Sequence, residues 1–553
     1  MITRLTVLFF ILAITACSDT HDAVPPVDRT GDRSPVSPEG PPLVLSIVPV
    51  ERAVELYERF LPLKYYLEGA LRRPVAIKIS KDYETAMQEI GRGEVHLAYL
   101  DPGTYCEVRA RYKGKVFPLA KVVGAGAARS RSVLIVKEGS GIERAADLKG
   151  KRIALGNPQS SFSYLIPLAL LQDVGLNVRD FSSVDFLQQE DRVVLSVLVG
   201  NHDAGGISEA VARKYLGDGL RIIQTSETIP QFVICASETL GEEIRRQVGK
   251  ALTEQQGGRG DSPGQGQTER FAAAEDRDFD VIRVMLRNLT GKDYIEYAPG
   301  TVRVAVLPLY SALTIYERYD PLMRYLSEQT GRQVKLVIPR TFEEFIEVVK
   351  SGRADFSYQN PFIFAILSRE MNIRPLVTTI GEDCSGEEAI CGEDRFRGVI
   401  LTRQDSGITT VRDLKNRRVM VVSPKSAGGY LSQKIYLREY GIDADRDLRI
   451  IDAKKQERVI LGVYRGEADA GFVRESAPVV WKNVVDASKL RILARTTYLP
   501  NWPLAVCNAD RAGLAPRVRK LLTELTDEAI LRSARIKGFR VARDSDYEAL
   551  THY

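Results

Sequence analysis

The feature that most constrains this chain of 553 residues is that its two halves repeat each other. Tyr57–Arg59 matches Tyr316–Arg318 at an offset of 259 positions, and nearby matches keep that offset without a gap. Later matches, such as Ser160 with Ser426, are 266 positions apart. A period this long is too large for a solenoid repeat and indicates a duplicated domain. Whatever one half folds into, the other half is expected to fold into as well.

Strand-like and helix-like segments alternate at the start of each copy. In the first copy, apolar runs at 43–48, 75–79 and 95–100 are separated by helical patterns at 51–71 and 83–90. This order predicts an α/β fold with a largely parallel sheet. In such sheets, ligands bind beyond the carboxyl ends of the strands.

A second α/β segment begins near Gly141 in the first copy and near Gly407 in the second. We therefore expect each copy to have two lobes around a cleft that closes on a ligand. The predicted organisation is a signal peptide over 1–17, a tether over 18–42, a first domain over 43–298 (lobe I 43–140 and 230–298, lobe II 141–229, disordered loop 255–270) and a second domain over 299–553 (lobe I 299–406 and 498–553, lobe II 407–497).

The N-terminus has the pattern of an export signal. Arg4 precedes an apolar run at 5–16 that is short for a membrane span, and the run ends in Ile-Thr-Ala before Cys17. This ending resembles a bacterial lipobox, which implies lipidation of Cys17; the alternative is an ordinary secretory signal with an incidental cysteine. The segment 18–42 is rich in Pro, Asp, Ser and Gly, a composition typical of a flexible spacer. We expect a protein that is anchored by lipid on the periplasmic side of a bacterial envelope membrane.

Composition excludes several classes of function. The chain has 77 basic and 72 acidic residues, so its charge is nearly balanced and nothing favours nucleic acid as a partner. Its four histidines form no metal-binding spacing, and neither a nucleophile elbow nor a phosphate-binding Walker loop is present. We therefore predict that the chain is not an enzyme and has no metal or cofactor.

The cysteines suggest structural roles. Cys384 and Cys391 lie close together in a segment that lengthens the second copy, and they could pair in an oxidising compartment. Cys106, Cys235 and Cys507 have the pattern of isolated buried thiols. Cys106 follows a turn on the expected cleft side, so contact with a soft ligand is an alternative there.

A serine-rich turn is the strongest candidate for a binding element. The strand-like run at 152–155 leads into Ser160 and Ser161, and a helical pattern follows. The first turn of a helix carries unpaired N–H groups and partial positive charge, so hydroxyls there make an anion site. A simple helix cap is the alternative. The second copy has a turn at the same place, which includes Ser426 and Gly428.

Several ordered motifs resemble those of bacterial extracytoplasmic solute-binding proteins of the phosphonate, phosphite and phosphate type, which serve ABC transporters. They are the segments at 93–102 and 352–361, 141–152, and 200–206 and 466–472, together with the lipobox and the serine turns. The resemblance covers residues 43–553 twice. It implies tandem periplasmic-binding-protein domains of type II, each with two α/β lobes around a cleft.

The resemblance also implies which residues contact the ligand. Anion contacts would come from the serine turns, and aromatic residues of lobe I would line the opposite side; Phe342 takes the place that Tyr83 has in the first copy. An aspartate in the Gly-x-x-Asp-Ala-Gly turn would accept a hydrogen bond from the ligand, although a turn-forming role is equally open. The implied ligand-binding residues are Tyr83, Tyr99, Ser160, Ser161, Asp203, Tyr358, Ser426, Gly428 and Asp469.

The two turns depart from the family pattern in different ways. The first reads Ser160-Ser161-Phe162 and the second reads Ser426-Ala427-Gly428, so the ligands of the two copies need not be the same. The expected function is to bind a small oxyanion and deliver it to an ABC permease. The alternative is a sensory or scaffold lipoprotein that reports an oxyanion to a signalling partner such as a sensor kinase.

Overall fold

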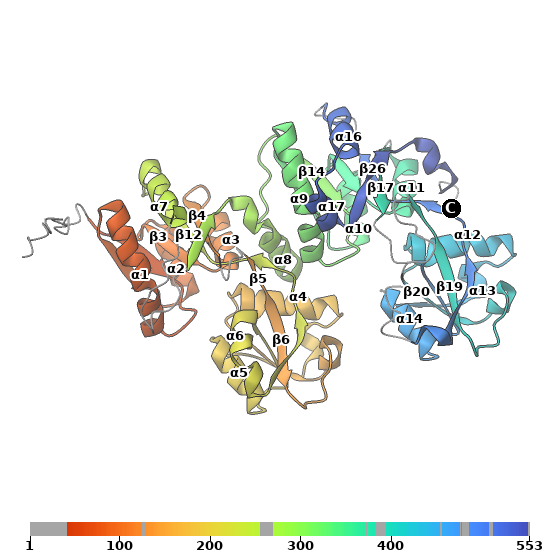
Figure 1. Cartoon of the computed structure of the whole chain (residues 1–553), viewed down its shortest axis with the longest axis horizontal. Coiled ribbons are helices and arrows are strands. Elements are labelled where there is room, and N and C mark those ends of the chain that lie inside the picture. The colour runs from red at the N-terminus through yellow and green to blue at the C-terminus, as the bar shows by residue number, and fades with distance from the viewer. Residues whose placement is uncertain are drawn as a thin grey trace, which may run out of the picture.

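The computed structural model describes residues 41–123, 129–254, 269–371, 373–381, 394–453, 456–475, 477, 486–507 and 513–550. The predicted signal peptide with Cys17, nearly all of the tether, most of the predicted loop at 255–270 and the Cys384–Cys391 pair lie outside the described residues. Figure 1 shows two similar domains, each with two lobes.

Both domains contain regular α/β elements. The strands of the first domain are β1 (Leu43–Ile47), β2 (Val75–Ile79), β3 (Leu97–Leu100), β4 (Val116–Val123), β5 (Arg129–Ser130), β6 (Ser132–Lys137), β7 (Arg152–Leu155), β8 (Ser183–Phe186), β9 (Ala204–Ser208), β10 (Leu220–Thr225), β11 (Ile229–Pro230), β12 (Val233–Ser237) and β13 (Arg270–Ala273). Its α-helices are α1 (Ala53–Leu71), α2 (Tyr83–Gly91), α3 (Pro102–Arg111), α4 (Ile166–Asp173), α5 (Glu190–Leu198), α6 (Glu209–Lys214), α7 (Glu242–Glu254) and α8 (Asp280–Thr290).

The second domain repeats this series. Its strands are β14 (Val302–Val306), β15 (Val334–Val337), β16 (Phe356–Tyr358), β17 (Arg374–Gly381), β18 (Arg395–Phe396), β19 (Gly398–Arg403), β20 (Arg418–Val421), β21 (Arg449–Asp452), β22 (Ala470–Arg474), β23 (Leu490–Arg495), β24 (Leu499–Pro500), β25 (Pro503–Val506) and β26 (Ile536–Val541). Its α-helices are α9 (Ala312–Thr330), α10 (Phe342–Lys350), α11 (Pro361–Glu370), α12 (Ser432–Glu439), α13 (Ala444–Asp447), α14 (Gln456–Tyr464), α16 (Ala515–Thr523) and α17 (Glu528–Ala534).

The sheets confirm the duplication. Lobe I of the first domain has the strand order β13-β4-β12-β3-β1-β2, and lobe I of the second has β26-β17-β25-β16-β14-β15. Lobe II has β10-β6-β9-β7-β8 in the first domain and β23-β19-β22-β20-β21 in the second. The orders correspond strand by strand, so the predicted α/β fold with two lobes per copy is confirmed.

Local sequence explains why these elements form. In α1 the apolar side chains at helical spacing, Leu56, Phe60, Leu63 and Leu67, are the ones that are buried against the sheet. Strands β1 and β3 are buried almost throughout, as expected for central strands of a sheet that is covered on both faces.

The predicted lobe boundaries need one correction. Strand β6 pairs with β9 and β10 of lobe II, so lobe II begins at Ser132 rather than at 141. Strand β19 likewise puts the start of the second lobe II at Gly398 rather than at 407. The prediction placed the boundary at the first repeat motif, but the apolar strand before that motif has already crossed over. The short ladders β5–β11 and β18–β24 join the lobes at these crossovers.

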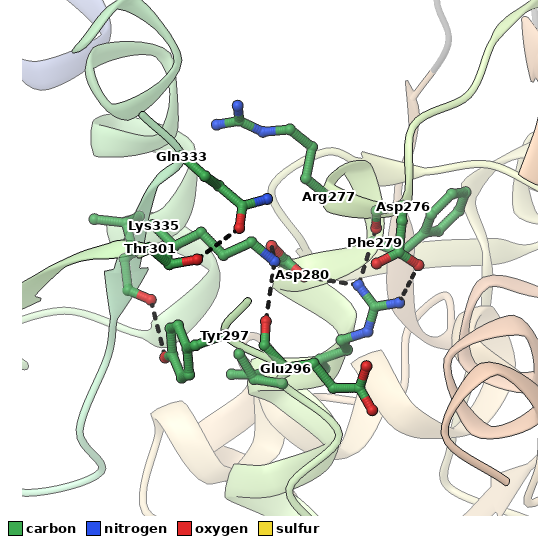
Figure 2. A network of polar contacts seen from close by, with 12 residues as sticks. Asp276, Arg277, Phe279, Asp280, Glu296, Tyr297, Thr301, Gln333 and Lys335 are labelled. Atoms are coloured by element: carbon green, nitrogen blue, oxygen red, sulfur yellow. Dashed lines mark hydrogen bonds and ion pairs between the residues drawn. The ribbon is translucent and has the colours of Figure 1, made fainter. Parts of the chain in front are cut away.

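The two lobes I meet in a mixed apolar and ionic junction. Helix α8 lies beside α9 of the second domain, between the two lobes in the view of Figure 1. Apolar residues of both domains belong to one continuous core cluster. Figure 2 shows Asp280 of α8 at the centre of a polar network with Lys335 of β15, whose Nζ is 3.0 Å from the carboxylate. Arg283 donates to the same carboxylate at 2.7 Å.

Further polar contacts join α9 to the first domain. Tyr316 donates to the Arg277 carbonyl at 2.9 Å, and Arg324 donates to Asp278 at 2.9 Å. Thr228, at the crossover of the first domain, donates to Glu317 at 2.7 Å. Because Asp280, Arg283 and Lys335 are all nearly buried, losing one partner would leave an unpaired charge in the interior. Among the described helices, none is both long and apolar enough to cross a membrane.

Candidate functional site

Both serine turns begin a helix at the carboxyl end of a lobe II strand. The turn Ser161–Leu165 is a short π-helix that continues into α4, and Ser160 caps it by accepting from the Ser163 N–H at 3.3 Å. In the second domain, Ala427–Leu431 has the same form, and Ser426 accepts from the Gly429 N–H at 3.2 Å. Each turn therefore is a helix cap, and each also faces lobe I.

The second domain has a cavity of about 590 Å³ between its lobes. Lobe I contributes residues of α9, β16, β17 and the segment after α17, and lobe II contributes the serine turn and the end of β22. The residues that line this cavity include Tyr310, Arg318, Tyr319, Tyr358, Asn360, Thr379, Phe396, Ser426, Gly428, Gln456, Arg474, Trp502 and Arg535. A separate cavity of about 30 Å³ lies within the apolar core of lobe I and has no chemistry of its own.

The cavity between the lobes of the second domain is cationic. Three arginines line it, and none of the described residues that line it is acidic. The Arg318 guanidinium lies 3.9 Å from the centre of the Tyr310 ring, and that of Arg474 lies 4.5 Å from the Phe396 ring. Stacking on an aromatic face leaves the edge of a guanidinium able to donate to an oxyanion.

The remaining walls are aromatic and neutral. Tyr358 contacts Trp502 with ring centres 5.2 Å apart, and its hydroxyl is 3.0 Å from the Thr379 hydroxyl. Burial raises the pKa of Tyr358 above its usual value, so the phenol stays protonated. Gln456 accepts from the Arg474 N–H at 2.9 Å. The site therefore combines hydrogen-bond donors, rings and positive charge.

In the first domain, a carboxylate of lobe I lies against the serine turn. Asp101, fully buried at the start of α3 in lobe I, accepts from the Ser161 N–H at 2.9 Å and from the Ser161 hydroxyl at 2.6 Å. It also accepts from the Gly103 N–H at 2.8 Å. Burial raises the pKa of Asp101 to about 6, with the three donors opposing that rise. The turn thus binds a side chain of its own domain.

A second carboxyl lies close by. Glu190, at the start of α5, accepts from the Ser208 hydroxyl at 2.5 Å and from the Ser208 N–H at 3.2 Å. Burial raises the pKa of Glu190 to about 7. Tyr83 is buried beside Ser160, and desolvation raises its pKa well above the usual value, aided by the charges of Asp101 and Glu190. Tyr83, Ser160 and Ser161 are thus brought together as predicted.

Aromatic rings lie beside the serine turn of the first domain. Phe162 of the serine turn is stacked near Phe232 with ring centres 5.9 Å apart, and Phe232 is stacked on Tyr99 at 4.9 Å. Tyr99 makes an edge contact with Phe60 at 4.8 Å. Phe162 is 4% exposed and belongs to the core cluster of lobe I, although its backbone lies in lobe II.

The repeat offsets identify the corresponding residues that make the two clefts differ in charge. Asp101 corresponds to Asn360, Glu190 to Gln456, and Ser208 to Arg474. Two acidic groups of the first cleft are therefore neutral amides in the second, and a hydroxyl has become a cation. Arg59, the counterpart of Arg318, forms ion pairs with Glu51 at 2.8 Å and with Glu269. Among the described residues, Arg318 has no acidic partner.

Two predicted site residues lie elsewhere. Asp203 precedes β9 at the amino ends of the strands, and it pairs with Arg152 at 2.9 Å. Asp469 pairs with Arg418 in the same way at 3.0 Å. These ends are opposite to the serine turns, so neither carboxylate is in a cleft. The hydrogen bond from Arg152 lowers the pKa of Asp203. The aspartates stabilise strand starts, which corrects their predicted role as ligand contacts.

The sequence prediction missed the arginines and Asn360. The repeat alignment contained the signal, because it pairs acidic residues of one copy with amides of the other. Cys106, Cys235 and Cys507 are buried free thiols as expected, and burial raises the pKa of Cys106 to about 12. Phe342 begins α10, half-buried. Within the described part of the chain, no cluster of three His, Cys, Asp or Glu side chains could hold a metal.

Comparison with known proteins defines the family. The model of the periplasmic phosphonate substrate-binding proteins of ABC transporters matches residues 45–279 and again residues 304–547. The chain therefore belongs to this family and carries two copies of its domain. The family consists of solute-binding proteins, and its description implies a place outside the cytoplasm.

Two relatives show the range of the family. The phosphate-import protein PhnD of Mycolicibacterium smegmatis is 25% identical over 252 residues, which is 44% of this chain and 76% of the relative. The tetrathionate sensor histidine kinase TtrS of Salmonella typhimurium is 26% identical over 245 residues, which is 40% of this chain and 39% of the kinase. The PhnD1 structure from Prochlorococcus marinus with methylphosphonate has a TM-score of 0.40 at 16% identity and covers 45% of this chain and 98% of that one.

Proposed function

We propose that this chain is a membrane-anchored extracytoplasmic solute-binding protein that binds a small oxyanion for ABC-type uptake. The oxyanion is a phosphonate, phosphite or phosphate-like group, and the cleft of the second domain takes it. The observation that carries the proposal is the cavity of about 590 Å³ that three arginines line, with no acidic side chain among its described lining residues.

Charge and geometry support an oxyanion at the serine turn. The start of the helix gives partial positive charge and backbone donors, and Ser426 adds a hydroxyl. Arg318 approaches from lobe I and Arg474 from lobe II, so an anion between them would bond to both lobes and stabilise the closed form. The cavity is larger than phosphate alone requires, and its aromatic walls suit an organic substituent.

The test is isothermal titration of the purified chain with inorganic phosphate, phosphite and methylphosphonate. We expect saturable binding of at least one of them and its loss in Arg474→Gln. Arg418→Gln is the matched control, because Arg418 lies at the other end of the same lobe and pairs with Asp469. Absence of heat with all three anions would contradict the proposal, as would equal binding by both variants.

Membrane attachment rests on Cys17 and is tested separately. Cells that express the chain should incorporate labelled palmitate into it, and Cys17→Ala should abolish that label. The membrane fraction should lose the chain at the same time. Attachment that survives Cys17→Ala without label would remove the lipid anchor from the proposal.

A sensory role is the second candidate, because one relative is a sensor histidine kinase. The match spans 39% of that kinase, so the likeness concerns only part of it. Affinity purification of the full chain from its native membrane distinguishes the two roles: a permease and its ATPase support uptake, whereas a histidine kinase supports signalling.

A further inference from the structure

We propose that Asp101 and Phe162 act as a built-in ligand of the first domain, which holds that cleft closed and excludes solutes from it. The second cleft then is the one that binds solute. This inference concerns the side chains of the first domain and stands whichever ligand the second domain takes.

Asp101 makes the contacts that a bound oxyanion would make. Its two carboxylate oxygens receive the Ser161 N–H, the Ser161 hydroxyl and the Gly103 N–H, at 2.6 to 2.9 Å. The donors come from the start of the serine-turn helix in lobe II and from the start of α3 in lobe I. A carboxylate at the N-terminus of a helix is favoured by the same field that favours phosphate. The side chain therefore already uses the donors that a solute would need.

The carboxylate also bonds the lobes together. Asp101 belongs to lobe I and Ser161 to lobe II, so two of its hydrogen bonds cross the cleft. The Gly103 N–H additionally donates to the Ser161 hydroxyl oxygen at 2.8 Å. A Cβ atom at Gly103 would be 2.9 Å from that oxygen, which shows how closely the lobes approach. In a binding protein of this kind the ligand normally supplies such bonds, and here the chain does.

Phe162 fills the space beside the turn. Its ring stacks in series with Phe232 and Tyr99 of lobe I and is 4% exposed. Opening this cleft would expose a large apolar ring to water, which is unfavourable. In the second domain the same position is Gly428, where a Cβ would already be 3.0 Å from the Phe396 ring. A large ring therefore occupies this position in one copy, whereas the other copy has a glycine, where an added Cβ would be in tight contact with the Phe396 ring.

Other acidic residues of the first domain oppose the entry of an anion into this cleft. Glu190 lies on the lobe II side, and Glu269 pairs with Arg59, the arginine that corresponds to Arg318. An oxyanion entering the first cleft would have to displace one carboxylate while lying near another. Like charges repel one another in a low-dielectric cleft, and besides burial the charge of Asp101 already contributes to the raised pKa of Glu190. In the second domain Asn360 and Gln456 remove both obstacles.

The central test exchanges the residue that distinguishes the clefts. Asp101→Asn keeps a side chain that the fold accepts, because Asn360 caps the equivalent helix by accepting from the Ile363 N–H at 2.9 Å. Hydrogen–deuterium exchange of the full chain, followed in peptides that cover 158–165, reports the lobe contact. We expect these amides to be well protected in the wild type and to exchange at least tenfold faster in Asp101→Asn. Inorganic phosphate and methylphosphonate should leave the wild-type rate unchanged.

The reciprocal variant makes the second domain resemble the first. Asn360→Asp should protect the amides in 424–431 without any ligand and should abolish whatever phosphate or methylphosphonate binding the wild type has. This variant leaves the first domain untouched, so it remains informative if changes at Asp101 impair folding. Addition of Phe162→Gly to Asp101→Asn should raise the number of bound methylphosphonate molecules from one to two.

The outcomes separate this inference from the proposed function. If the wild type binds none of these anions but Asp101→Asn still releases the amides at 158–165, the proposed ligand is wrong and the built-in ligand stands. If phosphate protects those amides in the wild type, the first cleft accepts solute and the inference is overturned. Unchanged exchange in both Asp101→Asn and Asn360→Asp would overturn it as well.

Discussion

The two clefts of this protein have the same architecture and opposite electrostatics. In the first, a buried aspartate and a phenylalanine occupy the serine turn; in the second, an asparagine and a glycine leave a cavity of about 590 Å³ beside three arginines. Both turns are short π-helices with a capping serine, and the second differs in backbone at Gly429, whose φ and ψ are not helical. The comparison teaches that a turn able to bind an anion does not by itself identify a binding site. The residues that face it from the other lobe decide whether it is available.

The largest difference in oxyanion binding should appear between substitutions of Arg318 and of its counterpart in the first domain, Arg59. Arg318→Gln should weaken oxyanion binding by about 10- to 100-fold, because a hydrogen bond to a charged group contributes about 1.5–3 kcal/mol. Arg59→Gln should leave binding unchanged, since Arg59 pairs with Glu51 and Glu269 in the closed cleft. Titration calorimetry of both variants with methylphosphonate measures this contrast. Equal losses would mean that both clefts bind.

The pH dependence of stability should differ between the domains. Burial raises the pKa of Asp101 to about 6, so the folded state holds this proton more tightly than the unfolded state does. The free energy of unfolding therefore falls as pH rises from about 4 to about 6, by roughly 3 kcal/mol for a shift of two pKa units, and is level above that range.

Differential scanning calorimetry at pH 4.5 and pH 7 measures this effect. The wild type should lose more stability across the interval than Asp101→Asn, which has no proton to release at this position. Glu190, whose pKa burial raises to about 7, adds a change of the same sign, so Glu190→Gln is a second comparison. A wild type and an Asp101→Asn variant with the same pH dependence would show that Asp101 is not held in this environment.

Removing the shared hydroxyl should distinguish its two roles. Ser160→Ala and Ser426→Ala each delete a helix cap, which should cost about 1 kcal/mol of stability in either domain. Only Ser426→Ala should also weaken oxyanion binding, by about tenfold, as expected for one hydrogen bond to a charged group. Thermal denaturation and titration of both variants check this, and a loss of binding in Ser160→Ala would contradict it.

The smallest effect is expected at the aspartates that the sequence analysis assigned to the ligand. Asp469→Asn and Asp203→Asn should each leave the dissociation constant within about twofold of the wild type, because both carboxylates pair with arginines at the far ends of their strands. A much larger change in the dissociation constant of Asp469→Asn would indicate that Asp469 takes part in ligand binding.

Much of the fold follows from the repeat alone. The offset of 259 residues paired the elements of lobe I, and the alternation of strands and helices predicted the α/β class. The lobe boundary was placed too late because a strand and its crossover are set by pairing partners, β9 and β10 for β6, that are distant in sequence. No local pattern marks which sheet an apolar strand will join.

The site was harder to predict for the same reason. The serine turns were found because a helix start is a local feature, but Asp101 contacts Ser161 from 60 positions away. Asp203 was assigned to the ligand by motif, yet its carboxylate binds Arg152, which starts the neighbouring strand. The substitutions of Asp101 by Asn360 and of Glu190 by Gln456 were visible in the alignment. Their meaning depended on knowing that both positions face the turn.

Helix α9 has two duties that cannot be varied independently. It carries Arg318 and Tyr319 into the second cleft, and it presents Tyr316 and Arg324 to the first domain. The first domain is thus part of the frame that positions a binding arginine. An excised second domain would expose an apolar and ionic surface and would lose the support of that arginine, so its affinity would describe the excision rather than the protein. Substitutions at the junction would likewise change affinity without touching the ligand, because they would shift α9 and with it Arg318.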